Sequence, residues 1–405
     1  MEINFLNDLE WRGLIYQKTP GIENVFNKGA TIYYGVDATA DSLHFGHLLG
    51  YLVLKRAYEA GHNIIVLMAT GTAAIGDPSG KDAERPIVSK DILAANKEKL
   101  SKQVENFFKI DGKRVKTIDN AEWLEKLSLI DFLRDTGKYI SANSMMDMES
   151  VKTRLSRQEG ISYAEFSYQL LQAYDFLRFY EDHQCEVQIG GSDQWGNMIQ
   201  GVELIRKKIS REAHVLSYPL IVDPKTGKKF GKTEKGAAIW LDPEKTPPFA
   251  FYQFFINVED ELAPVLMKYY SFKSKEEIEE LIGEWQKQKE TRLIQKELAY
   301  ELTEMVHGRE LADQSKAVAS ILFERKGEGL TEKDLKFIKK SVPYTTLSSQ
   351  NDLVLEEVLI QLGLVQSKNE ARRLIEQKGV ISNNLFNKYF LIRKGKKDYG
   401  IVEIV

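Results

Sequence analysis

Short apolar runs alternate with longer segments of helical spacing over about the first 220 residues of the chain. The apolar runs predict strands at 31–36, 63–69 and 186–189. Apolar residues three and four positions apart predict helices at 47–60 and 194–208. Because strands and helices that alternate along a chain form a parallel sheet covered by helices, this pattern predicts an α/β fold. Ligands of such sheets bind outside the carboxyl ends of the strands, so the loops after these runs are candidate binding loops.

Breaks in the alternation predict where the domains meet. Prolines close to residue 247 end the α/β part, and a polar stretch with glycines and a proline ends the helical part that follows. Within the helical part, Ser274 to Glu277 form a capping box that predicts a helix start. The expected units are, in order, an α/β domain at 1–246 with a helical insertion at about 90–181, a helical domain at 247–325, a linker at 326–350 and a small α+β module at 351–405.

Composition excludes several classes of protein. One cysteine in 405 residues excludes a disulfide framework and a four-cysteine zinc site. The longest purely apolar run, at 64–69, is far short of the ~20 residues that a membrane span needs. The N-terminal residues lack the order of a signal peptide. We therefore expect a soluble, cytoplasmic protein of several domains, without a membrane partner.

The formal net charge of −3 divides unevenly along the chain. Residues 366–397 contain nine basic and two acidic side chains, so this segment carries +7 and the rest of the chain carries −10. A dense basic segment predicts binding to nucleic acid, although a solvated helix face is the ordinary alternative. The near-neutral total is thus the sum of an acidic body and a basic end.

A pair of histidines stands between the first predicted strand and its helix. His44 and His47, with Gly46 between them, are three positions apart and face the same way on the first turn of the helix. Backbone amides at a helix N-terminus suit a polyphosphate, and the glycine lets a flat ligand approach the backbone. Half of a zinc site and two ordinary surface histidines remain as alternatives.

Two further patterns suggest chemistry. Lysines surround a glycine at 228–234, where they could clamp a leaving pyrophosphate, and a solvated basic turn is the alternative. Tyr168, Gln172 and Asp175 follow the spacing i, i+4 and i+7, which makes one polar stripe on a helix. Such a stripe can face a substrate or belong to a polar network in the core.

Together these motifs resemble the class I aminoacyl-tRNA synthetases, with 44–47 in the place of the "HIGH" motif and 229–233 in the place of "KMSKS". Phe45 and the pair Phe230–Gly231 depart from those motifs. Four longer strings, at 33–37, 76–81, 165–175 and 188–197, resemble the bacterial tyrosyl-tRNA synthetases, and the likeness runs over essentially the whole chain. It implies a Rossmann-like catalytic domain with a mobile signature loop at about 223–236, an anticodon-region helical domain, an RNA-binding module and a homodimer formed through the insertion.

The resemblance also implies roles for individual residues. Those expected to bind tyrosine are Tyr33, Asp77, Tyr168, Gln172, Asp175 and Gln188. Of these, Tyr33 and Asp175 would bind the phenol hydroxyl, and Tyr168, Gln172 and Asp77 would hold the α-ammonium. Those expected to bind ATP are Gly35, Asp37, Gly46, Gly191, Asp193, Gln194 and Lys232. Those expected to act on the phosphates are Thr39, His44, His47, Lys81, Arg85, Lys229, Lys232 and Thr233. Gly50 is a further departure, because relatives often carry a larger polar residue there.

Two groups of basic residues are expected to contact RNA. The first lies in the C-terminal module, whose string 367–381 resembles a ribosomal RNA-binding module, and comprises Lys368, Arg372, Arg373 and Lys378. The second follows the third strand's helix, could meet an acceptor stem, and comprises Arg206, Lys207 and Lys208.

The implied reaction joins L-tyrosine and ATP into tyrosyl-adenylate and pyrophosphate, and then transfers the tyrosyl group to tRNA(Tyr). Mg²⁺ is expected to accompany ATP as substrate, and no structural metal is expected. Three alternatives remain: a tryptophanyl-type synthetase, a nucleotidyltransferase that adenylylates a small acid, and a non-catalytic RNA-binding protein that keeps a synthetase fold.

Overall fold

The structure is a computed structural model and describes residues 4–79, 87–108, 110–156, 160–222, 227, 229–231, 237–324, 327–395 and 398–405. These residues form two compact units. The first comprises Met1–Trp240 with Lys268–Tyr270, and the second comprises Leu241–Met267 with Ser271–Val405.

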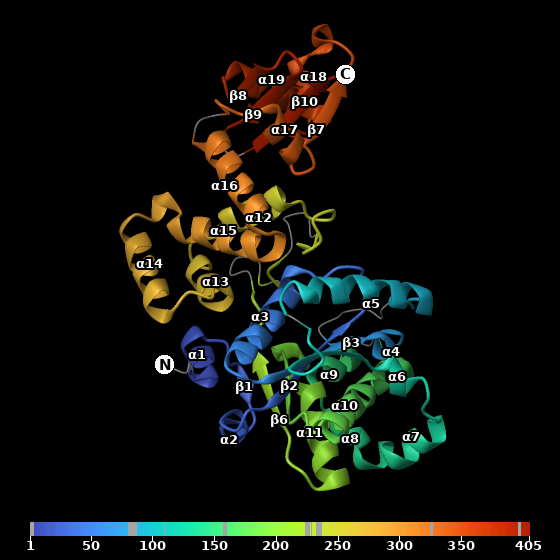
Figure 1. Cartoon of the computed structure of the whole chain (residues 1–405). Helices are drawn as coiled ribbons and strands as arrows, with labels where there is room; N and C mark the ends of the chain where they lie inside the picture. Colours follow the sequence, from blue (N-terminus) through green and yellow to red (C-terminus); the bar gives the residue numbers. More distant parts are fainter. Residues whose placement is uncertain are drawn as a thin grey trace. The chain divides into compact units, whose positions relative to one another are not determined.

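A six-stranded sheet with the order β1-β6-β5-β2-β3-β4 forms the centre of the first unit (Figure 1). Only β1 runs antiparallel to its neighbour, and the other pairs are parallel. Helices cover both faces of such a sheet, which is why β3 is a continuous apolar run with six of its seven residues buried. The strands are β1 (Gln17–Lys18), β2 (Thr31–Asp37), β3 (Asn63–Ala69), β4 (Val115–Asp119), β5 (Val187–Gly191) and β6 (His214–Tyr218). The α/β fold and its three predicted strands are confirmed.

The strand order reverses beside β2. The chain runs from β2 to β3 and β4 on one side, and β5 and β6 extend the sheet on the other side of β2. Open α/β sheets bind their ligands at such a reversal, outside the carboxyl ends of the strands, and here those strands are β2 and β5.

Eleven α-helices lie in the described part of the first unit. Helix α3 is buried nearly all round and contacts β2, β3 and β5, whereas α11 contacts β5 and β6 and packs on α10. They are α1 (Phe5–Arg12), α2 (Ile22–Phe26), α3 (Phe45–Glu59), α4 (Thr70–Ala73), α5 (Lys90–Glu105), α6 (Ala121–Leu124), α7 (Leu129–Asp135), α8 (Ala142–Met146), α9 (Glu149–Ser156), α10 (Tyr163–His183) and α11 (Trp195–Ile209). The predicted helices at 47–60 and 194–208 are therefore confirmed as α3 and α11.

The stretch at 90–181 differs from the expected helical insertion in one respect. It contains β4, which pairs in parallel with β3 along the edge of the sheet. Helix α5 packs on β3 before the chain enters β4, so α5 and β4 extend the alternating pattern instead of interrupting it. Only the part after β4 is entirely helical in the described residues.

The second unit begins with helices and ends with a small sheet. The capping box is confirmed, because Ser274 and Glu277 exchange hydrogen bonds at the start of α14. The helices are α12 (Pro248–Ile256), α13 (Ala263–Tyr270), whose last three residues belong to the first unit, α14 (Lys275–Lys287), α15 (Leu293–His307), α16 (Arg309–Phe323), α17 (Glu332–Ile338), α18 (Leu355–Gln361) and α19 (Lys368–Glu376).

The final sheet has the order β7-β10-β9-β8. Its strands are β7 (Tyr344–Leu347), β8 (Val380–Leu385), β9 (Tyr389–Lys394) and β10 (Asp398–Ile404). Residues 326–350, expected to be a linker, instead contain α17 and β7, and β7 pairs in parallel with β10 at the end of the chain. Gly327, Gly329 and Pro343 therefore mark turns between elements. In the part of the chain that the structure describes, no helix is long and apolar enough to cross a membrane.

Candidate active site

His44 and His47 lie at the carboxyl end of β2, where α3 begins. His44 is the residue before the first turn of α3, and its backbone nitrogen donates to Nδ1 of His47 at 3.3 Å. The two rings stack with centroids 3.7 Å apart. A Cβ on Gly46 would lie 3.0 Å from Cε1 of His44, so the glycine makes room for this ring. The predicted position of the motif between strand and helix is confirmed.

The lysine-containing motif lies directly beside the histidine motif. The backbone nitrogen of Phe45 donates to the carbonyl of Ile239 at 2.8 Å. The Phe45 ring meets the Phe230 ring edge-on at 5.7 Å, and a Cβ on Gly231, whose φ is +104°, would lie 3.0 Å from Cδ1 of Phe45. The residues that depart from the two family motifs thus contact one another. Four residues expected to act here, Lys81, Arg85, Lys232 and Thr233, lie outside the described residues.

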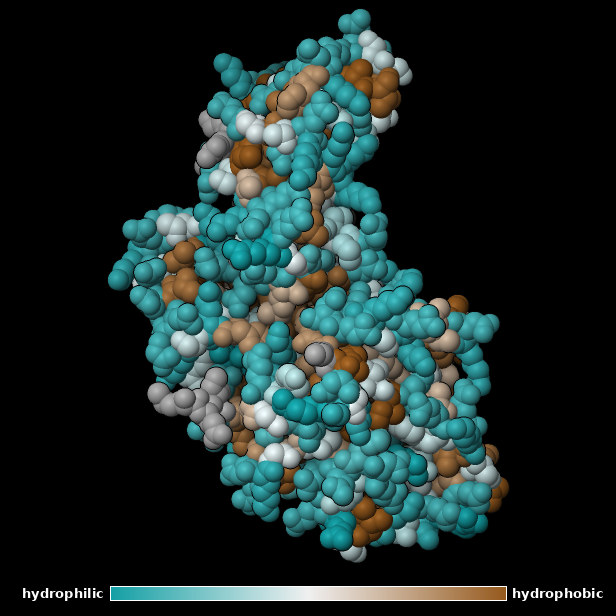
Figure 2. Space-filling view, in the orientation of Figure 1, coloured by the Kyte–Doolittle hydropathy of each residue, from teal (hydrophilic) through white to brown (hydrophobic). Residues whose placement is uncertain are grey.

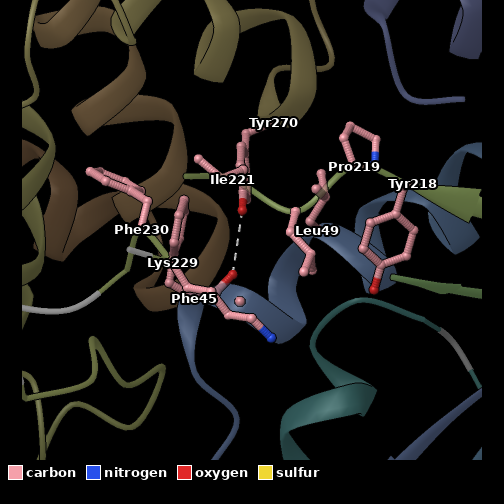
Figure 3. A pocket seen from close by; sticks show the side chains of 10 residues that line it. Phe45, Leu49, Tyr218, Pro219, Ile221, Lys229, Phe230 and Tyr270 are labelled. Carbon is pink, nitrogen blue, oxygen red and sulfur yellow. Dashed lines mark hydrogen bonds between the residues drawn. The ribbon is translucent and has the colours of Figure 1, made fainter. Parts of the chain in front are cut away.

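A cavity of about 60 Å³ opens between the two motifs (Figure 3). Phe45, Gly46 and Leu49 of α3 line one side, and Tyr218, with Lys229 and Phe230 of the second motif, lines the other. The hydroxyl of Tyr270, whose ring stacks on Phe45 at 4.5 Å, donates to the carbonyl of Phe45 at 3.4 Å. Nζ of Lys229 lies 2.8 Å from the carboxylate of Asp193. One lysine therefore borders a small space that is otherwise lined mainly by apolar and aromatic residues.

Asp175 is held in a closed polar site on α10. Its side chain is 1% exposed, and its two oxygens accept hydrogen bonds at 2.8 Å from Nδ2 of Asn120 and Nε1 of Trp123. Burial raises the pKa of this carboxyl to about 7, although the two hydrogen bonds lower it. The site therefore holds a carboxylate whose ionised form any additional hydrogen-bond donor would stabilise.

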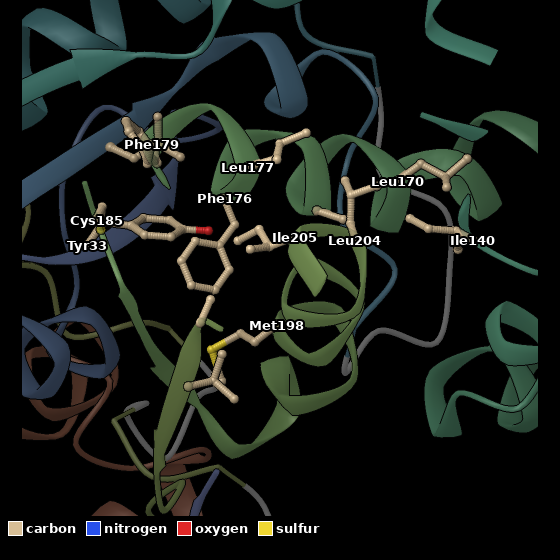
Figure 4. Close-up of a cluster of buried hydrophobic side chains, with 14 of the residues drawn as sticks. Tyr33, Ile140, Leu170, Phe176, Leu177, Phe179, Cys185, Met198, Leu204 and Ile205 are labelled. Atoms are coloured by element: carbon tan, nitrogen blue, oxygen red, sulfur yellow. The ribbon is translucent and has the colours of Figure 1, made fainter. Parts of the chain in front are cut away.

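Tyr33 approaches the same helix from β2. Its ring packs against Phe176 at 5.3 Å and Phe179 at 4.8 Å (Figure 4). The hydroxyl is buried and has no hydrogen-bond partner among the residues that the structure describes. Burial, and then the nearby charge of Asp175, raise the pKa of Tyr33 well above its ordinary value. A buried phenol and a buried carboxyl thus lie near one another, as the sequence predicts for Tyr33 and Asp175.

A second polar group surrounds Asp77, at the start of the loop after α4. Asp77 accepts from Nε2 of Gln194 at 2.8 Å and from Nδ2 of Asn197 at 3.4 Å. The same Asn197 nitrogen lies 3.1 Å from Oε1 of Gln172. Three residues expected around the substrate ammonium or the nucleotide are therefore brought together by Asn197.

Tyr168, also expected at the ammonium site, is bonded elsewhere. Its hydroxyl donates to the Asp37 carboxylate at 3.1 Å, and Thr72 donates to the same carboxylate at 3.2 Å. Gln188 is 4% exposed, and its Oε1 has no partner within the described chain. Gly35, Asp37 and Thr39 lie on the last residues of β2 and the loop after it.

Three residues at these sites are missing from the sequence prediction. Asn120 and Trp123 follow β4, and nothing in their spacing links them to Asp175, which lies more than fifty residues away. Asn197 carried a usable signal, since it stands one helical turn after Gln194 at the end of a string that resembles the family. Within the described residues, no group of three His, Cys, Asp or Glu side chains is arranged to hold a metal ion.

The basic residues expected to contact RNA are on the surface, and several have acidic partners. In the C-terminal module, Lys368 pairs with Glu357 at 3.0 Å and Arg372 with Glu356 at 3.3 Å. Arg373 and Lys378 are exposed on and just after the same helix. On α11, Arg206 pairs with Glu203, Lys207 with the carbonyl of Tyr139, and Lys208 lies over the Tyr174 ring.

Comparison with known proteins agrees with this geometry. A family model described as class I tRNA synthetases (W and Y) matches residues 26–324. A tyrosine–tRNA ligase of Roseiflexus castenholzii is 41% identical, with 99% of each chain covered, and one of Staphylococcus saprophyticus is 42% identical, with 98% of each covered. A C-terminally truncated mitochondrial tyrosyl-tRNA synthetase of Aspergillus nidulans has a similar structure, with a TM-score of 0.71, 30% identity, and coverage of 79% of this chain and 94% of that one.

Proposed function

The chain belongs to the class I tRNA synthetases of the tryptophan and tyrosine type, and from that premise we propose that it is a tyrosine–tRNA ligase whose residues divide the work of two steps. In the first step, tyrosine and ATP give tyrosyl-adenylate and pyrophosphate. In the second step, the tyrosyl group passes to the 3′-terminal adenosine of tRNA(Tyr).

The observation that carries this function is that the buried Tyr33 hydroxyl and the buried Asp175 carboxyl lie near one another. When a substrate phenol enters, the buried Tyr33 hydroxyl gains its first hydrogen-bond partner and the buried Asp175 carboxyl gains one more, whereas phenylalanine would leave the Tyr33 hydroxyl without one. Tyrosyl-tRNA synthetase rejecting phenylalanine is the established example of this asymmetry, at about 10⁵ without editing. The same pair favours tyrosine over tryptophan, because an indole brings no hydroxyl to this position.

For the first step, we propose that the other polar residues orient two substrates. Asp77 and Gln172 would accept from the tyrosine ammonium, and Asn197 would hold both in position. The tyrosine carboxylate attacks the α-phosphorus of ATP, so that a new O–P bond forms and the bond to the β-phosphate oxygen breaks. No protein nucleophile is needed, because the substrate carboxylate is one.

The histidine and lysine motifs would bind the phosphates of ATP and neutralise their charge. His44 and His47, at the N-terminus of α3, would hold the phosphates of ATP, with the α3 dipole favouring negative charge. Lys229 lines the cavity together with Phe45 and Gly46 of α3 and would neutralise charge on the leaving pyrophosphate. Lys81, Arg85, Lys232 and Thr233 would act with it. Mg²⁺ would enter with ATP, as part of that substrate.

Amino-acid-dependent exchange of pyrophosphate into ATP tests this function. We expect exchange with tyrosine and far less with tryptophan or phenylalanine. Exchange with tryptophan would favour the tryptophanyl alternative. No exchange with any amino acid would favour a non-catalytic RNA-binding protein, and exchange with a different small acid would favour a nucleotidyltransferase.

The C-terminal module would serve the second step. Its exposed basic residues, Arg373 and Lys378 among them, would contact tRNA phosphates, a contact that weakens as salt is added. Removing the chain from residue 346 onward should reduce tRNA charging and spare pyrophosphate exchange. An equal loss of both activities would contradict this division. The place of the reaction would be the cytoplasm, where tRNA is charged.

We propose that the protein works as a homodimer formed through α7 and its neighbours. Leu129 and Ile130 on α7 are 68% and 69% exposed, and Tyr163 at the start of α10 is 72% exposed. Figure 2 shows apolar surface over α7. Exposed apolar side chains gathered on one segment are typical of a protein interface. Light scattering of the purified protein and of Ile130→Glu tests this: a dimer should become a monomer.

A further inference from the structure

Tyr34 of β2, Gly50 of α3 and Tyr218 of β6 form one tightly packed group. A Cβ on Gly50 would lie 2.5 Å from Cζ of Tyr34 and 2.7 Å from the hydroxyl oxygen of Tyr218. Both distances are far below van der Waals contact, so position 50 holds no side chain while the two tyrosines are in place. The glycine at this position is therefore explained by the tyrosines, one from each of two strands that face it.

The two tyrosine hydroxyls are hydrogen-bonded to one another. Their oxygens lie 3.4 Å apart, and the residues are 6% and 4% exposed. A bond between two hydroxyls uses one of their two protons, whichever hydroxyl donates. Within the described part of the chain, neither hydroxyl has another partner. One buried proton of the pair is therefore available to a ligand.

Tyr218 directs this pair toward the nucleotide cavity. It lines the cavity together with Gly46 and Leu49, as Figure 3 shows for Leu49 and Tyr218. It also borders the space above Gly191, where a Cβ would lie 2.8 Å from Oδ1 of Asp193 and 3.8 Å from the Tyr218 ring. Burial chiefly raises the pKa of Tyr218, and the charge of Asp193 adds to it, which agrees with this proximity. The edge of the Tyr218 ring and the Asp193 carboxylate therefore border the same space above Gly191.

Their chemistry matches a hydroxyl group on the ligand. A carboxylate only accepts hydrogen bonds, whereas the tyrosine pair has a proton to donate. A sugar hydroxyl does both, so it can donate to Asp193 and accept from Tyr218. We propose that Tyr218 binds a ribose hydroxyl of ATP together with Asp193, and that Tyr34, which fits only because residue 50 is glycine, positions the Tyr218 hydroxyl. This inference rests on the proposed ATP site.

The first test compares three nucleotides in pyrophosphate exchange: ATP, 2′-deoxy-ATP and 3′-deoxy-ATP. Tyr218→Phe should raise KM for ATP about 3- to 10-fold, the effect of one uncharged hydrogen bond, and leave KM for tyrosine unchanged. With the deoxynucleotide that lacks the bound hydroxyl, the variant and the wild type should have the same KM.

Tyr51→Phe is the matched control. The Tyr51 hydroxyl is also fully buried, has no partner in the described chain and does not line the cavity. An unchanged KM for ATP in Tyr218→Phe, or an equal rise with all three nucleotides, would overturn the proposal. Absence of exchange in the wild type would instead refute the proposed function, so the two failures are distinguishable.

The second test concerns the positioning role of Tyr34. Gly50→Ala should raise KM for ATP, because the added Cβ displaces the Tyr34 ring. In a Tyr34→Ala background, the same change should raise KM for ATP less, because only the 2.7 Å approach to the Tyr218 hydroxyl remains. Thermal melting of each variant verifies that it is folded. An equal rise in both backgrounds would overturn the positioning role.

Discussion

Tyr33→Phe is expected to stabilise the ligand-free protein and weaken tyrosine binding at the same time. The Tyr33 hydroxyl is buried, the residue is 1% exposed, and the hydroxyl has no hydrogen-bond partner in the described chain. A buried polar group without a partner costs ~1–3 kcal/mol, so its removal should raise stability by about 1 kcal/mol, the lower end of that range. For a unit of this size, 1 kcal/mol corresponds to a rise in Tm of roughly 2–4 °C.

The same hydroxyl should matter when the substrate is present. Loss of one uncharged hydrogen bond to the substrate phenol should raise KM for tyrosine about 3- to 10-fold and leave KM for ATP unchanged. Discrimination against phenylalanine should fall, because the hydroxyl that phenylalanine leaves without a partner is gone. A thermal melt of the ligand-free protein and pyrophosphate exchange measure the two effects.

Tyr51→Phe separates stability from binding. Its hydroxyl is equally buried and equally without a partner in the described chain, but it lies on α3, where its ring packs against Tyr34 and Phe107. This control should gain the same stability and keep its KM for tyrosine. A lower Tm of Tyr33→Phe, or an unchanged KM for tyrosine, would refute the reasoning that an unsatisfied hydroxyl is kept for the substrate.

Three further outcomes are expected. Asp175→Asn should raise KM for tyrosine about 10- to 100-fold, since a charged hydrogen bond is lost. Because burial raises the pKa of Asp175 from 3.8 to about 7, the stability of the ligand-free wild type should fall as pH rises through that range. If the Asp175→Asn variant showed the same pH dependence of stability, this reasoning would be contradicted. Lys229→Met should lower kcat for adenylate formation about 10- to 100-fold. The affinity for tyrosine, measured by equilibrium dialysis, should stay unchanged. An unchanged kcat would show that Lys229 does not act on the phosphates. Hydrogen bonds, chiefly from Tyr344 and then from Lys339, lower the pKa of Glu403 to about 2, so Glu403 stabilises the second unit above pH 4.5 and loses this effect as pH falls toward 2. Glu403→Gln should therefore lower the urea midpoint at pH 7 but not at pH 2. Equal shifts of the midpoint at both pH values would contradict this prediction.

Local patterns in the sequence were sufficient for the elements and for part of the site. The strand at 63–69 is legible because a parallel strand buried on both faces is apolar throughout, and β3 has the predicted bounds. The stripe of Tyr168, Gln172 and Asp175 is legible because residues four and seven apart share one face of α10. The position of the histidine motif could be predicted because a strand, a short loop and a helix follow one another there.

Contacts between distant elements were beyond those patterns. Residues 326–350 were expected to be a linker, because glycine and proline mark turns locally and the partner strand of β7 comes about fifty residues later. Which polar side chains surround Asp175 also depends on the strand order. Asn120 and Trp123 reach Asp175 only because β4 lies at the edge of the sheet and α6 follows it.

The sequence determined the fold class, the family and the positions of the two motifs, because each depends on residues close together in the chain. Tertiary structure decided what individual residues are for. From the sequence alone, Gly50 looks like the loss of a larger polar side chain on α3. It is nevertheless required by Tyr34 and Tyr218, which the strand order places against it. Phe45 and Phe230 likewise look like separate departures, and their rings meet edge-on. The physical reason is that packing is decided between elements, by the shape of side chains that the sheet brings together, whereas periodicity is decided within one element.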